Sequence, residues 1–126
     1  MHRSRLGGII IDCEVDNLDA AADFWSKALG YARRPSNAPE DEAYVLLNTA
    51  PEEIHIELQR VGHPSRVHLD IETDDVDAEV SRLESLGATK VQKVRNWWVM
   101  QAPTGHRFCV VSAERACFEE QANKWP

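Results

Sequence analysis

The chain has few cysteines, no long apolar run and no basic cluster, and each absence excludes a class of protein. Its three cysteines, Cys13, Cys109 and Cys117, are odd in number and form no CxxC pair, which favours a reducing cytosol over a disulfide-stapled secreted fold. The apolar stretch near the N-terminus is interrupted at Asp12 and Glu14, too early for a signal or membrane-spanning segment. We therefore expect a soluble, cytoplasmic protein.

Positive charge is also scarce. The chain has 14 Lys and Arg residues against 21 Asp and Glu residues, a formal net charge of −7. This balance opposes binding to nucleic acid and to anionic membranes, and it mildly favours cationic ligands. No Ser-His-Asp order, phosphate-binding loop or nucleotide fingerprint is present. Neither nucleic acid nor a membrane is therefore expected as a partner.

What the chain does contain is an internal repeat. The frame Asp12-Cys13-Glu14-Val15-Asp16 precedes a helix-like segment that ends at Gly30, and 58 positions later Asp70-Ile71-Glu72-Thr73-Asp74 precedes one that ends at Gly87. A repeat of this length indicates two related modules. In this alignment Ile10 is the twin of His68.

Hydrophobic periodicity gives each module the order strand, helix, three strands. In module one, about residues 6–62, the expected helix ends at Leu29, and the expected strands are 8–15, 31–34, 44–48 and 54–60, with a loop at 35–42 and a turn at Ala50-Pro51. In module two, about residues 66–112, the expected helix is 75–86, and the expected strands are 66–72, 89–94, 97–101 and 107–112. Residues 113–126 are expected to form a polar tail, either frayed or a short helix. At 126 residues, this predicts a single α+β domain.

Strand alternation assigns side chains to the two faces of the predicted sheet. In the strand at 66–72, Val67, Leu69 and Ile71 are expected to face the helices, which leaves Arg66, His68, Asp70 and Glu72 on the opposite face. The same alternation turns His55, Glu57 and Cys109 toward the face of His68. The carboxylates Asp12, Glu14, Asp70 and Glu72 are expected to be rim residues or caps.

Three segments carry a family resemblance: Asp23-Phe24-Trp25-Ser26-Lys27-Ala28-Leu29-Gly30, Val67-His68-Leu69-Asp70 and Pro103-Thr104-Gly105-His106-Arg107-Phe108-Cys109-Val110-Val111. Together they resemble the vicinal-oxygen-chelate superfamily of glyoxalases, bleomycin-resistance proteins and extradiol dioxygenases, and most closely its glyoxalase-like branch. The resemblance spans about residues 6–112. It implies paired βαβββ modules, with eight strands forming a curved sheet around a cleft and the helices outside. It also implies a homodimer and a small organic ligand.

The resemblance further implies where a metal would bind. Metal-using members take one ligand from each of four strand positions, which here hold Ile10, Glu57, His68 and Cys109. Ile10 has no donor atom, and Cys109 offers a thiolate in place of a carboxylate. Three interpretations stay open: a metal set of Glu57, His68 and His55, a soft-metal role for Cys109, or a metal-free pair in which Glu57 and His68 bind each other or water.

Two main functions therefore compete, and no catalytic residue is assigned. The first is binding or sequestration of a small organic molecule without the full metal site and without a cofactor. The alternative is a metal-dependent lyase, isomerase or dioxygenase whose cofactor is a divalent ion; as an enzyme it would be a glyoxalase- or dioxygenase-like lyase or oxidoreductase. An accessory or dimerisation module is a third interpretation. The candidate ligand-binding residues are Ile10, Glu57, His68, Trp97, Trp98 and Cys109, with one of the two tryptophans expected as a flat platform and the other in the core.

Overall fold

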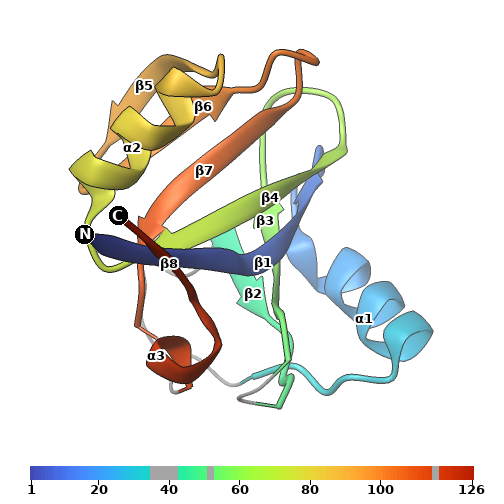
Figure 1. Ribbon diagram of the computed structural model, residues 1–126. Coiled ribbons are helices and arrows are strands. Elements are labelled where there is room, and N and C mark those ends of the chain that lie inside the picture. The colour runs from blue at the N-terminus through green and yellow to red at the C-terminus, as the bar shows by residue number, and fades with distance from the viewer. Residues whose placement is uncertain (35–42, 51–52, 115–116) are drawn as a thin grey trace. The chain divides into compact units, whose positions relative to one another are not determined.

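The computed structural model describes residues 1–34, 43–50, 53–114 and 117–126 and has the predicted α+β class (Figure 1). Its strands are β1 (His2–Cys13), β2 (Tyr44–Leu46), β3 (His55–Arg60), β4 (Arg66–Thr73), β5 (Thr89–Val94), β6 (Trp97–Gln101), β7 (Arg107–Ser112) and β8 (Asn123–Trp125). Its helices are α1 (Leu18–Leu29), α2 (Val76–Ser85) and α3 (Phe118–Gln121). The strands form a mixed sheet of order β2-β3-β1-β4-β7-β6-β5, with β8 paired to β1. The chain divides into two compact units, residues 9–67 and residues 1–8 with 68–126.

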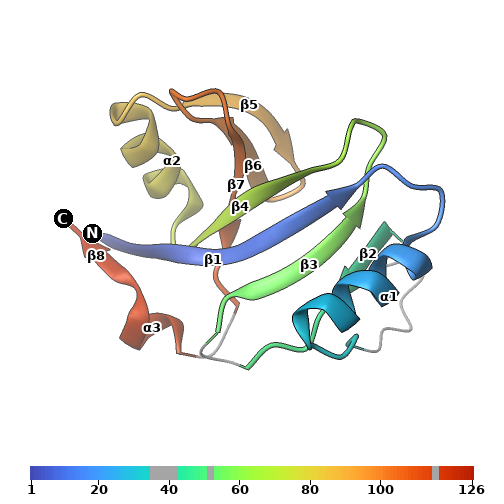
Figure 2. The same cartoon turned by 90° about the vertical axis from the view of Figure 1, so that its right-hand side faces the viewer.

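In the unit of residues 9–67, α1 lies against β2 and β3 (Figure 2). The Asn17 side chain caps the helix by accepting a hydrogen bond from the Asp19 amide, and Gly30 ends it at a φ of 79°, where a residue without Cβ is favoured. The helix buries its apolar stripe against the strands. The core consists of Ile11, Cys13, Leu18, Ala22, Leu47 and Leu58.

In the unit of residues 1–8 and 68–126, β4 pairs with β7 in parallel, and β7, β6 and β5 follow as antiparallel neighbours. Helix α2, capped by the Asp75 side chain, packs on β5 and β7. Its core consists of Val80, Leu83, Ala88, Met100 and Val110. Both helices therefore bury one apolar stripe, as an amphipathic pattern predicts.

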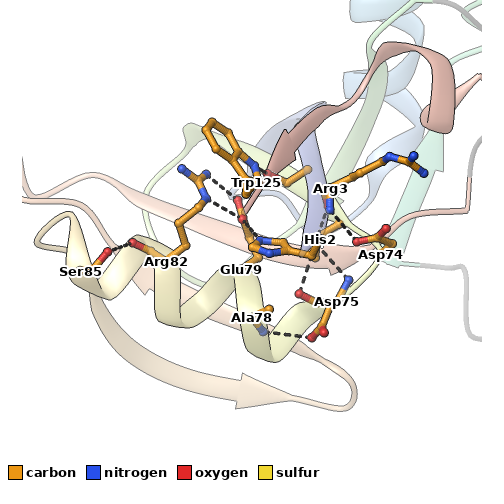
Figure 3. A network of polar contacts seen from close by, with 11 residues as sticks. His2, Arg3, Asp74, Asp75, Ala78, Glu79, Arg82, Ser85 and Trp125 are labelled. Atoms are coloured by element: carbon orange, nitrogen blue, oxygen red, sulfur yellow. Dashed lines mark hydrogen bonds and ion pairs between the residues drawn. The ribbon is translucent and has the colours of Figure 1, made fainter.

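The C-terminal segment of this second unit is docked along the start of the chain. Strand β8 pairs antiparallel with β1, with Trp125 opposite His2, so the two chain ends lie side by side (Figures 1 and 2). Trp125 Nε1 donates to Ser4 Oγ at 2.8 Å, and the Arg82 guanidinium lies 3.9 Å from the centre of its ring (Figure 3). Of the two forms expected for this tail, the short helix is present as α3, and a strand follows it.

Two strand expectations need correction. Residues 31–34, expected as a strand, make only an isolated bridge between Arg33 and Leu47, so the eighth strand is β8 instead. Strand β1 begins at His2 and not at residue 8, because its polar start is stabilised by distant partners such as Glu79. The loop expected at residues 35–42 and the Pro51 position of the Ala50-Pro51 turn lie outside the described residues.

The burial of several side chains also differs from expectation. Val67, Leu69 and Ile71 were all expected to face the helices, but only Ile71 packs with the core under α2. Val67 and Leu69 are 59% and 46% exposed. Conversely, Asp12 and Glu72 are buried and not at a rim; Arg66 Nε lies 3.9 Å from Asp12, and Arg5 forms an ion pair with Glu72. Among the described residues, no helix is long and apolar enough to cross a membrane.

Candidate functional site

The sheet of the unit formed by residues 1–8 and 68–126 has one face under α2 and one face away from it. Ile71, Trp98, Met100, Phe108 and Val110 lie on the helix side, where they form or line the core. The strand register pairs Asp70 with Cys109 and Cys109 with Val99, so these residues share the opposite face. Trp97 and His68 lie on that same face, since each is two residues from one of them.

Three of these side chains converge. His68 Nε2 lies 3.5 Å from Asp70 Oδ1, and one ligand atom from each of His68, Asp70 and Cys109 lies within 4.8 Å of the others. The His68 and Asp70 side chains are 12% and 17% exposed, which leaves them partly accessible. In the part of the chain that the structure describes, these three side chains form the group of His, Cys, Asp or Glu residues whose ligand atoms lie close enough together to hold a metal ion.

The Asp70 carboxylate is under-satisfied in this arrangement. Its Oδ1 atom is buried and accepts no hydrogen bond from the described residues, and its contact with His68 Nε2 is longer than a normal hydrogen bond. A buried carboxylate oxygen without a donor costs about 1–3 kcal/mol or more. The site therefore contains an oxygen that a bound cation or hydrogen-bond donor would stabilise.

The two adjacent tryptophans have separate roles. Trp98 packs with the core under α2, and the ammonium groups of Lys90 and Lys93 lie 4.9 Å and 6.0 Å from the centre of its ring. Trp97, half-buried, is on the face of Cys109. The register of β6 with β7 therefore places Trp97, and not Trp98, on the face where a ligand platform beside His68 and Asp70 would lie.

Three further candidate residues lie in the other unit, residues 9–67. Ile10 is only 2% exposed on β1. His55 and Glu57 lie on β3, on the face opposite Ile56 and Leu58, both of which pack in the core. Of the six candidate ligand-binding residues, His68, Trp97, Trp98 and Cys109 thus belong to one unit and Ile10 and Glu57 to the other.

Sequence reasoning missed Asp70 as a site residue. Alternation had placed it on the face of His68, but its position near a strand end suggested a rim role. The signal that would have found it is the His-x-Asp spacing combined with Cys109, its partner in the parallel β4–β7 pair.

The comparisons with known proteins identify the family. A model of the glyoxalase-like domain matches residues 8–111. The chain belongs to this family. It thereby falls within the glyoxalase, bleomycin-resistance and dioxygenase superfamily, as the sequence resemblance predicted. A comparison with curated proteins finds no significant match.

Solved structures share the fold of this glyoxalase-like chain at low sequence identity. A methylmalonyl-CoA epimerase from Mycobacterium tuberculosis is 20% identical, with a TM-score of 0.57 over 86% of this chain and 87% of its own. A superfamily member from Vibrio splendidus is 14% identical, with a TM-score of 0.58 over 90% and 100%. A Legionella pneumophila protein described as an NAD-dependent benzaldehyde dehydrogenase is 12% identical, with a TM-score of 0.61 over 84% and 99%. These likenesses establish the fold alone.

The metal site that the superfamily resemblance implies does not fit this glyoxalase-like chain. One of its four positions is occupied by Ile10, whose side chain is buried, apolar and without a donor atom. A hard divalent ion favours oxygen ligands and would also meet a thiol at Cys109. No step of chemistry can be assigned to a metal held by that four-residue set.

Proposed function

We propose that this glyoxalase-like protein binds a small organic molecule without the four-ligand metal site of its superfamily. The observation that supports the proposal is the burial of Ile10, which has no donor atom and stands at one of the four positions where the superfamily resemblance implies a metal ligand. The face of Trp97, Cys109, Asp70 and His68 offers the groups that such binding needs: a flat apolar surface, hydrogen-bonding groups and a carboxylate oxygen with no donor.

The chemistry of this face favours a flat ligand that carries a positive charge or a hydrogen-bond donor. The Asp70 oxygen is an acceptor without a hydrogen bond, and the net charge of the protein is −7. Both features attract cations and repel anions. The Trp97 ring supplies stacking area and attracts a cation through its π system.

The test uses two probes with the same ring and opposite charges, 1-naphthylmethylamine and 1-naphthoate. The four tryptophans are replaced biosynthetically with 5-fluorotryptophan, and their fluorine resonances are assigned from single Trp→Phe variants. Titration in the presence of a chelator should shift the Trp97 resonance with the amine and leave Trp25, Trp98 and Trp125 unchanged. The naphthoate should bind more weakly.

Three outcomes would count against this proposal. They are no response to either probe at millimolar concentration, a response confined to tryptophans other than Trp97, and equal responses to the amine and the naphthoate. The Trp98→Phe variant is the matched control, because Trp98 packs under α2. Its amine affinity should equal that of the wild type.

The proposed form of the protein is a homodimer. Two apolar side chains on β4, Val67 and Leu69, are 59% and 46% exposed and would be removed from water by a partner surface. Light scattering over a concentration series tests this point independently of ligand binding, and a monomer at all concentrations would contradict it.

A further inference from the structure

The cluster of His68, Asp70 and Cys109 has the composition of a transition-metal site. Imidazole and thiolate are the ligands of zinc and cobalt, and a carboxylate is a common third. All three side chains come from β4 and β7, whose parallel register places Asp70 directly opposite Cys109. The paired strands therefore bring the ligands together within one unit.

We propose that His68, Asp70 and Cys109 form a three-ligand site for a thiophilic divalent ion, with Zn(II) as the type case. This site goes beyond the proposed small-molecule binding, and it differs from the four-strand set that the superfamily resemblance implies. It requires neither Ile10 nor any residue of the unit that spans residues 9–67.

The distances fit a tetrahedral ion. With Zn–N and Zn–O bonds near 2.1 Å, a tetrahedron separates its nitrogen and oxygen ligands by about 3.4 Å. His68 Nε2 and Asp70 Oδ1 lie 3.5 Å apart. The Cys109 sulfur lies within 4.8 Å of one imidazole nitrogen of His68 and one carboxylate oxygen of Asp70. Because sulfur and nitrogen ligands of zinc lie about 3.6 Å apart, the sulfur needs to move by no more than about 1 Å to complete the set.

Charge and hydrogen bonding favour the bound state. The thiol of Cys109 loses its proton to solvent as the sulfur–metal bond forms. One thiolate, one carboxylate and a neutral imidazole then balance the two positive charges of the ion. The ion also satisfies Asp70 Oδ1, which is buried without a hydrogen bond from the described residues. Three protein ligands leave the fourth tetrahedral position open to water.

The decisive probe is Co(II), which reports thiolate ligation by a charge-transfer absorption band in the near ultraviolet. Untagged protein is freed of metal with a chelator, dialysed and titrated with CoCl₂ under nitrogen. We expect one equivalent of Co(II) to produce the band and one equivalent of Zn(II) to abolish it. Mg(II) should not compete, because it favours oxygen ligands.

Two cysteines give a matched pair of variants, since Cys109 and Cys117 are both partly buried free thiols. Cys117→Ser should keep the band, whereas Cys109→Ser should lose it. Asp70→Asn and His68→Gln should each lower the affinity for Zn(II) by at least about 10- to 100-fold, which is the loss typical when a residue that only hydrogen-bonds to a metal ligand is removed.

A readout that does not depend on cobalt is protection from alkylation. Zn(II) should slow the reaction of Cys109 with iodoacetamide and leave Cys117 unaffected, as mapped by mass spectrometry. Co(II) binding without the band, a band that survives Cys109→Ser, or no Zn(II) protection of Cys109 would each overturn the site. The amine titration runs in chelator, so failure of this site and failure of the proposed function are distinguishable.

Discussion

The carboxylate of Glu79 on α2 accepts a hydrogen bond of 2.8 Å from Nε2 of His2, although 77 residues separate the two in sequence. The Glu79 side chain is fully buried, and Arg82 donates two further hydrogen bonds of 2.8 Å to its two oxygens (Figure 3). Glu79 thus joins the first residues of the chain to α2. No substrate role is needed to explain this buried charge, because every partner is part of the fold.

The first prediction concerns acid stability. Burial raises the pKa of Glu79, but hydrogen bonds from Arg82, His2 and Ser4 outweigh it and lower the pKa from its ordinary 4.5 to about 2. A lowered folded-state pKa means that the ionised carboxylate stabilises the fold above pH 4.5, and that this stabilisation is lost as the pH falls toward 2. We expect a loss on the order of 2–3 kcal/mol, measured by urea unfolding between pH 5 and 2.5.

The Glu79→Gln variant checks the source of that loss. It should lower the free energy of unfolding at pH 7 by about 3–5 kcal/mol, because Arg82 loses its buried partner. The difference in the free energy of unfolding between Glu79→Gln and the wild type should become smaller as the pH falls. Glu84→Gln, at an exposed position on the same helix, is the control. It should change neither the free energy of unfolding at pH 7 nor its loss at acid pH. An acid dependence that persists unchanged in Glu79→Gln would contradict the assignment.

The second prediction concerns the docked C-terminus. Trp125 donates a hydrogen bond to Ser4 and stacks under the Arg82 guanidinium. Trp125→Phe keeps an aromatic ring but loses the donor, at a cost of about 1 kcal/mol. Trp125→Leu also loses the cation–π contact, for about another 1 kcal/mol. Equal unfolding midpoints of the two variants and the wild type would show that β8 is not held by this ring.

The helices were predictable because their signals are local. The Asn17 cap and Gly30 bound α1, and Asp75 with Gly87 bound α2, all within one turn of the helix ends they define. The start of β1 gave no such signal. Its segment from His2 to Arg5 is polar, and it is ordered by Glu79 and Glu72, whose positions only the folded chain reveals.

The candidate site was predictable only in part. Alternation correctly placed His68, Asp70 and Cys109 on one face. However, the Cα atoms of residues i and i+2 on a strand are about 6.6 Å apart. Judged by spacing alone, His68 and Asp70 are therefore too far apart to share an ion. The His68 and Asp70 side chains lean together to 3.5 Å, and side-chain direction of this kind is not encoded in spacing.

The third prediction concerns the close approach of β1 to β4. A Cβ added at Gly7 would lie 2.8 Å from Cγ and 2.9 Å from Cβ of Glu72. Glu72 is buried and paired with Arg5, so it has little room to move. Gly7→Ala should therefore destabilise the protein by about 1–3 kcal/mol, measured by chemical unfolding. Gly62→Ala meets nothing within 4 Å and is the control, expected within about 0.5 kcal/mol of the wild type.

The last prediction orders the reactivity of the cysteines. Burial raises the pKa of the Cys13 thiol, and the nearby Asp12 carboxylate raises it further. Cys13 also belongs to the buried core that includes Leu18, Ala22 and Leu47, and its thiol donates to the Ile11 carbonyl. Because the thiolate is the reactive form, iodoacetamide at neutral pH should label Cys117 well before Cys13. Peptide mapping over time measures both rates in one sample, and in urea above the unfolding midpoint the two should become similar. Equal rates in the native protein would mean that Cys13 is not shielded by this core.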